Sequence, residues 1–140
     1  MTYRFVPNFA LRIVQQALLV EAIVRGFNYM STPDASSALY TELEQSAPLG
    51  VWGALFITCG VVGLFGEAWL SYNGSSLQWS HRAWPTFIAH VGLLALFLAF
   101  AVSSLLGVLS REPIYGYVTP YDFAFFALGH WAYARRRKHV

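Results

Sequence analysis

The sequence has few charged residues. Only 11% of its 140 residues are Asp, Glu, Lys or Arg, about half or less of the fraction usual in a soluble domain. No charged residue occurs from Ala83 to Ser110, and roughly 20 helical residues are enough to cross a hydrocarbon core of about 30 Å. This stretch therefore predicts a membrane-spanning helix, and the composition excludes an ordinary soluble globular protein.

Cysteine and catalytic motifs are also scarce. The single cysteine, Cys59, excludes an internal disulfide, and its apolar surroundings are typical of a packing residue. The sequence contains no His-Glu-x-x-His zinc helix, no Gly-x-Ser-x-Gly elbow, no phosphate-binding glycine loop and no Cys/His metal spacing. We expect a non-enzymatic protein without a cofactor, a metal or a nucleic-acid partner.

The hydrophobic segments predict an all-α, polytopic membrane protein in one domain over residues 1–140. Four transmembrane helices are expected in an antiparallel bundle, with a short amphipathic helix in the first external loop. The transmembrane helices are predicted at about 9–27, 48–70, 84–109 and 120–137, and the loop helix at about 33–45.

The first segment is the most polar. Arg12, Gln15 and Gln16 share one helical face, whereas Glu21 and Arg25 fall roughly on the opposite one. A helix lying on the membrane surface would keep one polar face along its length. The change of face favours a spanning helix over a surface helix, and the i,i+4 spacing of Glu21 and Arg25 predicts an ion pair.

The second segment is rich in small residues. Gly50, Ala54 and Thr58 form a small-xxx-small ladder, and Gly60 and Gly63 follow it. Such residues allow helix backbones to approach closely in lipid. We favour close packing within one monomer over the alternative, an oligomerisation face.

The distribution of basic residues predicts the orientation. Four alternating helices put both termini on one side, and that side holds most of the cations, whereas the other side holds one arginine and four acids. Cytoplasmic loops carry the excess of Lys and Arg, so both termini are expected in the cytoplasm of a bacterium, with the protein in the inner membrane. The inner cations are Arg4, Arg82 and the tail Arg135, Arg136, Arg137 and Lys138.

This topology converts spacing into depth. His90 is expected about 9 Å and His130 about 7 Å below the cytoplasmic surface at the helical rise. Arg12 and Gln16 on the first helix and Glu67 on the second lie in the same half of the membrane, so these five residues form a predicted intramembrane polar cluster. On the third helix, the predicted inward face consists of Thr86, His90, Phe97, Ala101 and Ser104.

Three interpretations of this cluster are open. The first, which we favour, is structural: Arg12 pairs with Glu67, and the histidines are hydrogen-bonded to neighbours. The second is a permeation or proton-sensing site, because histidine titrates near neutral pH. The third is a bis-histidine haem site formed by His90 and His130.

Four short motifs carry a resemblance to a known group. They are Ala-Pro-x-x-Val-Trp-Gly at 47–53, Trp-Pro at 84–85, Tyr-Gly-x-x-x-Pro at 115–120 and His-Trp-x-x-Ala-Arg-Arg at 130–136. Together they resemble small four-helix membrane proteins of actinobacterial bacteriophages, which are often grouped with holins. The resemblance implies a four-helix membrane fold and assigns no functional residue.

Three functions follow as hypotheses. The first is a self-assembling, permeabilising or holin-like membrane protein, which would act as a homo-oligomer in the lipid bilayer. The second is an accessory subunit that packs against a protein partner in a larger membrane complex. The third is a small channel or proton-sensing protein that uses its membrane-embedded histidines.

Overall fold

The computed structural model describes residues 8–33, 41–72 and 84–138, and these residues form five helices and no strand. The all-α prediction is confirmed, whereas the single domain over residues 1–140 stays a prediction. The helices are α1 (Asn8–Ser31), α2 (Thr41–Glu44), α3 (Leu49–Tyr72), α4 (Trp84–Leu109) and α5 (Val118–Lys138).

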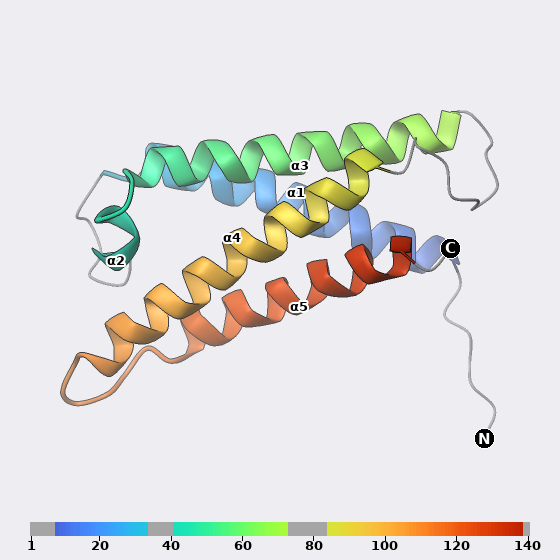
Figure 1. The fold of residues 1–140 in the computed structure, drawn as a ribbon. Coiled ribbons are helices and arrows are strands. Elements are labelled where there is room, and N and C mark those ends of the chain that lie inside the picture. The colour runs from blue at the N-terminus through green and yellow to red at the C-terminus, as the bar shows by residue number, and fades with distance from the viewer. Residues whose placement is uncertain (1–7, 34–40, 73–83, 139–140) are drawn as a thin grey trace, which may run out of the picture.

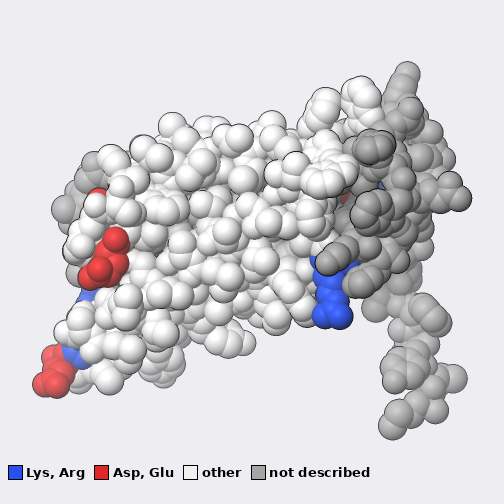
Figure 2. All heavy atoms as spheres, viewed as in Figure 1, with Lys and Arg blue, Asp and Glu red and all other residues white. Residues whose placement is uncertain are grey.

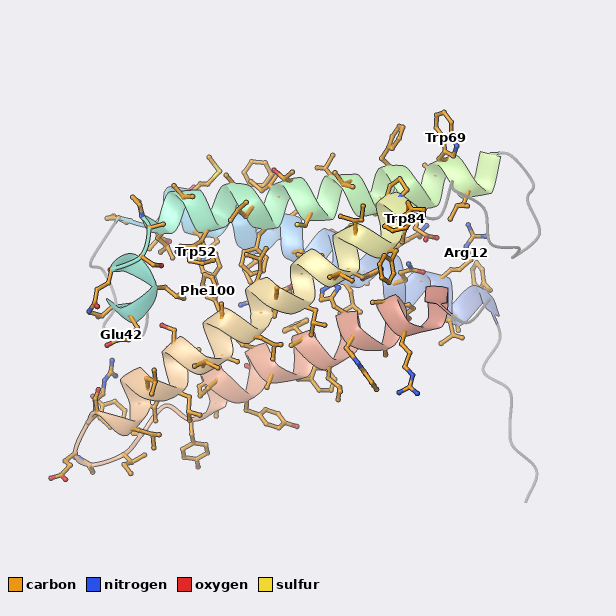
Figure 3. The ribbon with its side chains drawn as sticks, viewed as in Figure 1. Arg12, Glu42, Trp52, Trp69, Trp84 and Phe100 are labelled. Atoms are coloured by element: carbon orange, nitrogen blue, oxygen red, sulfur yellow. The ribbon has the colours of Figure 1, made fainter. Side chains whose placement is uncertain are left out.

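The four long helices form two hairpins that pack together through α3 and α4 (Figure 1). Helix α1 lies along α3, and α4 lies along α5, whereas α1 and α5 meet over a much smaller area. Trp69 and Trp84 lie near one end of this bundle, and Trp52 lies near the other (Figure 3). We call these ends the Trp69 end and the Trp52 end.

Two of the described helices are long and apolar enough to cross a membrane. They are α3, over Leu49–Leu70, and α4, over Trp84–Leu109. Both coincide with segments that the sequence predicts to span.

The predicted loop helix is only partly present. In the structure α2 is a single turn, Thr41–Glu44, Pro33 lies outside any helix, and residues 34–40 are outside the described part of the chain. The backbone amides of Ser46 and Ala47 and the hydroxyl of Ser46 all donate to the carbonyl oxygen of Leu43. These turn-type hydrogen bonds end the helix at Glu44. The predicted end, at about residue 45, is one residue later.

Helices α1 and α3 touch backbone to backbone through glycines. A Cβ atom added at Gly26 would lie 2.6 Å from the carbonyl oxygen of Gly53, and one added at Gly53 would lie 2.6 Å from that of Gly26. At Gly60 an added Cβ would lie 2.9 Å from the carbonyl oxygen of Leu19. Any side chain at these positions would push the two helices apart, so the glycines set their separation.

The predicted small-residue ladder is wrong as a packing face within the monomer. Ala54 and Thr58 are exposed, and a Cβ added at Gly50 would meet nothing within 4 Å. Gly60 and Gly63 do pack, as predicted, against α1, and Gly63 also faces α4. At 100° per residue the centre of the ladder lies about 150° around the helix from the midpoint of Gly60 and Gly63, so both sets cannot face the bundle.

Aromatic rings fill the core toward the Trp52 end. Phe56, Phe97, Phe100 and Phe123 are fully buried. The ring centroids of Phe56 and Phe97 are 5.0 Å apart, and those of Phe100 and Phe123 are 5.3 Å apart, both ordinary aromatic packing distances. The predicted inward face of the third span is confirmed, since all five of its residues are buried in α4.

Candidate functional site: a buried polar relay

Each of the four long helices contributes one polar side chain to a buried group toward the Trp69 end. They are Gln15 on α1, Glu67 on α3, His90 on α4 and His130 on α5. Gln15 and Glu67 are each 3% exposed, and both histidines are 0% exposed. We call these four residues the relay.

The relay is one unbroken chain of contacts. Gln15 Nε2 donates to Glu67 Oε1 at 3.1 Å, and the same nitrogen lies 3.0 Å from His90 Nε2. On the other side of its ring, His90 Nδ1 lies 2.8 Å from His130 Nδ1. All three distances are within hydrogen-bond range, so the four helices are joined through side chains alone.

The order of donors fixes the histidine tautomers. The Gln15 amide nitrogen carries two protons, one given to Glu67 and the other directed at His90 Nε2, which must therefore accept. The ring proton of His90 is then on Nδ1 and is donated to His130 Nδ1, so the proton of His130 is on Nε2. The reverse orientation of the amide would place its oxygen against the Glu67 carboxylate, which is unfavourable.

Aromatic rings enclose the two histidines. The Tyr133 ring stacks on His90 with centroids 5.5 Å apart, and the Phe97 ring stacks on His130 at 5.3 Å. The Tyr133 hydroxyl donates to the backbone oxygen of Leu11 at 2.7 Å and so ties α5 to α1 beside the relay. In such an environment of low polarity each hydrogen bond is stronger, and each unmet donor is more costly, than in water.

The relay ends in a buried nitrogen without an acceptor. Among the described residues His130 Nε2 has no hydrogen-bond partner, although it is buried. By the donor order above this atom carries the ring proton of neutral His130. The relay is therefore satisfied at Glu67 and unsatisfied at His130.

A second polar group lies farther toward the Trp52 end. Glu21 and Arg25 form the ion pair that their spacing predicts, and their side chains are 25% and 24% exposed. The Arg25 guanidinium carbon lies 5.1–5.6 Å from three ring centroids, close enough for cation–π attraction. Those rings are Phe97, Phe123 and Phe126. Phe97 thus contacts both Arg25 and the relay histidine.

The structure brings three of the five predicted cluster residues together and replaces one. Glu67, His90 and His130 meet, but Gln16 is exposed and its neighbour Gln15 takes the predicted place. Arg12 is also exposed, near the Trp69 end (Figure 3), and its pairing with Glu67 stays a prediction.

Burial on α1 follows the helical face of Gln15 and not that of Gln16. Leu19, Ala22 and Gly26 are buried on α1 and follow Gln15 by four, seven and eleven residues, the repeat of one helical face. Gln16 belongs to no such buried series. In the sequence alone Gln16 is also followed by apolar residues at helical spacing, namely Leu19, Val20, Ile23 and Phe27, so only the packing of α1 distinguishes the two glutamines.

The geometry between the histidines does not suit a haem. The two Nδ1 atoms are 2.8 Å apart, whereas a metal held between two ring nitrogens needs about 2 Å on each side. The described residues also contain no group of three or more His, Cys, Asp or Glu side chains that could hold a metal ion. This arrangement suits a proton between the two rings.

Comparison of the chain with protein-family models, curated proteins and solved structures finds no match.

Proposed function

We propose that the protein is a non-enzymatic, four-span protein of the bacterial cytoplasmic membrane that senses protons through the relay. Four spans are supported by large apolar side chains that are exposed along every long helix, α1 and α5 included. They include Val14, Val20 and Val24 on α1; Val51, Leu55 and Val61 on α3; Ile88, Leu98 and Leu106 on α4; and Phe125, Leu128 and Trp131 on α5. The bilayer is the partner that such a surface fits.

The placement of charges and tryptophans supports the same arrangement. On the face drawn in Figure 2 the charged atoms lie at the two ends of the molecule, and the broad band between them is uncharged. Trp52, Trp69 and Trp84 lie toward the two ends (Figure 3), as indoles do at membrane interfaces. On this proposal the Trp69 end faces the cytoplasm.

Topology reporters test the spans and the orientation. Fusions after Glu44 and Tyr115 are expected to report the outside, and fusions after Tyr72 and Lys138 the cytoplasm. An external signal after Lys138 would overturn the orientation. The same side reported after Glu44 and Tyr72 would remove the α3 span.

One observation carries the proton-sensing function: a buried histidine pair links all four long helices through hydrogen bonds. Histidine is the side chain whose ordinary titration lies near physiological pH. A proton gained there changes which atoms donate and accept, and so changes contacts on every long helix. Because Phe56, Phe97, Phe100 and Phe123 fill the neighbouring core, sensing is favoured over ion flow through one copy.

Distance measurements between helices test this function. Spin labels at Val14 on α1 and Leu128 on α5, both exposed, are introduced into a Cys59→Ala background in nanodiscs. Between pH 8 and pH 4 the distance distribution is expected to shift in the parent protein and to stay constant in the double variant that carries His90→Gln and His130→Gln. Labels at Val20 and Val61 on the glycine-packed α1–α3 hairpin are the control and should not move. A parent distribution independent of pH would reject proton sensing.

Self-assembly is a second candidate, because the ladder of Gly50, Ala54 and Thr58 lies on the outer surface of α3. Small residues on a lipid-facing helix allow a second helix to approach closely. Crosslinking through a cysteine at Ala54, with Val61 as the control position, is expected to give dimers or larger species if this face assembles. Holin-like permeabilisation would in addition collapse the membrane potential of an expressing bacterium, and an intact potential would exclude it.

A further inference from the structure

The Gln15 amide stands between a carboxylate and a histidine ring, and its two ends differ in chemistry. Its nitrogen now faces both Glu67 Oε1 and His90 Nε2. If His90 Nε2 gained a proton, that nitrogen would become a donor and would need an acceptor. A turn of the amide would supply one, because it brings Oε1 to His90. Since the same nitrogen now contacts both groups, this turn also ends its present donation to Glu67 Oε1.

We propose that the relay is a binding site for a single proton, which is shared between His90 and His130 and has Glu67 as its counter-ion through Gln15. This inference rests on the proposed proton-sensing function and specifies its site, its stoichiometry and the residue that sets its strength. Protonation of His90 Nε2 makes His90 a cation that donates its Nδ1 proton to His130 Nδ1. Transfer of that Nδ1 proton moves the charge to His130 and leaves His90 neutral with its proton on Nε2.

The distance between the rings limits the pair to one added proton. The two Nδ1 atoms are 2.8 Å apart, so one proton can lie between them but two cannot. Doubly protonated rings would place two N–H groups head to head and two positive charges within a buried site. The second histidine therefore stays neutral until the pair separates.

Glu67 is the anion that the relay itself supplies. A proton held by the histidine pair places a positive charge one amide group away from the Glu67 carboxyl group. Among the other charged or titratable groups, Tyr133 on α5 stacks on His90 and donates to Leu11, and Arg12 lies one turn before Gln15 on α1. The Glu21–Arg25 pair lies beyond the Phe97 ring and is already neutral as a pair.

Nitrogen NMR on the whole protein tests the proposal. The chain is labelled with ¹⁵N-histidine in nanodiscs, and the His90→Gln and His130→Gln variants assign the signals. At high pH the expected tautomers are Nδ1–H for His90 and Nε2–H for His130. On acidification the pair is expected to gain one proton. A coupling between the two Nδ1 nuclei should show that they share a hydrogen bond. Opposite tautomers, or one independent proton on each ring, would overturn the proposal.

The Glu67→Gln variant tests the counter-ion. In this variant the proton concentration at which the histidine pair is half-protonated is expected to be at least about tenfold higher, because the nearby negative charge is gone. We call this concentration the midpoint. Glu21→Gln is the matched control and should change this value less than about twofold. An unchanged midpoint in Glu67→Gln would remove Glu67 from the site.

The NMR and spin-label results can fail separately. One shared proton without a pH-dependent change in helix distance would support this inference and reject proton sensing. A pH-dependent movement of the helices while both histidines stay unprotonated would reject this inference. The tautomers of the parent protein decide the inference even if Glu67→Gln does not fold.

Discussion

The relay and the Glu21–Arg25 ion pair place polar side chains inside the same bundle in two different ways. The relay joins residues 52, 75 and 40 positions apart in the chain, one from each long helix. The ion pair joins residues four apart on α1. Polar side chains inside one bundle can thus be joined across four helices in one place and within one helix in another.

The two groups also differ in how their charge is held. The relay is almost fully buried, and Gln15 on α1 donates a hydrogen bond to its carboxylate. The ion pair is about a quarter exposed, and its guanidinium group contacts three phenylalanine rings from α4 and α5. Loss of one member should therefore cost more in the relay than in the ion pair.

The largest expected effect comes from breaking the relay at its central amide. Gln15→Leu removes the donor to both Glu67 and His90, and leaving a buried carboxylate without this bond should cost about 3 kcal/mol of unfolding free energy. Gln16→Leu, at the exposed neighbour, is the matched control and should cost under about 0.5 kcal/mol. Unfolding in detergent micelles measures both. Equal losses would mean that the relay does not stabilise the bundle.

Glycine substitutions should have a smaller effect. They distinguish the α1–α3 contact from the surroundings of the relay. Gly53→Ala would place a Cβ 2.6 Å from the Gly26 carbonyl oxygen and should cost about 1–2 kcal/mol. Gly66→Ala, next to Glu67 and against Thr86, should cost a similar amount and also change the histidine titration. Gly50→Ala, which meets nothing, should be neutral or slightly stabilising. If Gly53→Ala also changed the histidine titration, the relay would not be independent of the α1–α3 glycine contact.

The smallest effect is expected at the ion pair. Arg25→Lys keeps the positive charge but loses the planar group that lies over three rings, at a cost of about 1 kcal/mol. Thermal unfolding in detergent measures the loss, and the histidine titration should be unchanged. A loss as large as that of Gln15→Leu would contradict the ranking of the two groups.

The sequence predicted local features better than long-range contacts. The Glu21–Arg25 pair and the inward face of α4 follow from spacing on one helix, and both are present. The meeting of His90 and His130 required matched depth on two helices, which the positions of the charges supplied. The choice of Gln15 over Gln16, and the outward turn of Gly50, Ala54 and Thr58, depend on how each helix rotates against its neighbours. That rotation is set by packing across the bundle, which no single segment specifies.

We expect the relay to act as one unit that is separate from the ion pair. A double-mutant cycle tests it with Glu67→Gln and His130→Asn, at the two ends of the relay, where coupling must pass through Gln15 and His90. A second cycle combines Glu67→Gln with Arg25→Gln, and unfolding free energies are measured in detergent. We expect the first pair to deviate from additivity by about 1 kcal/mol or more and the second to be additive within about 0.5 kcal/mol. Additive losses in the first cycle would show that the four residues do not act as one unit.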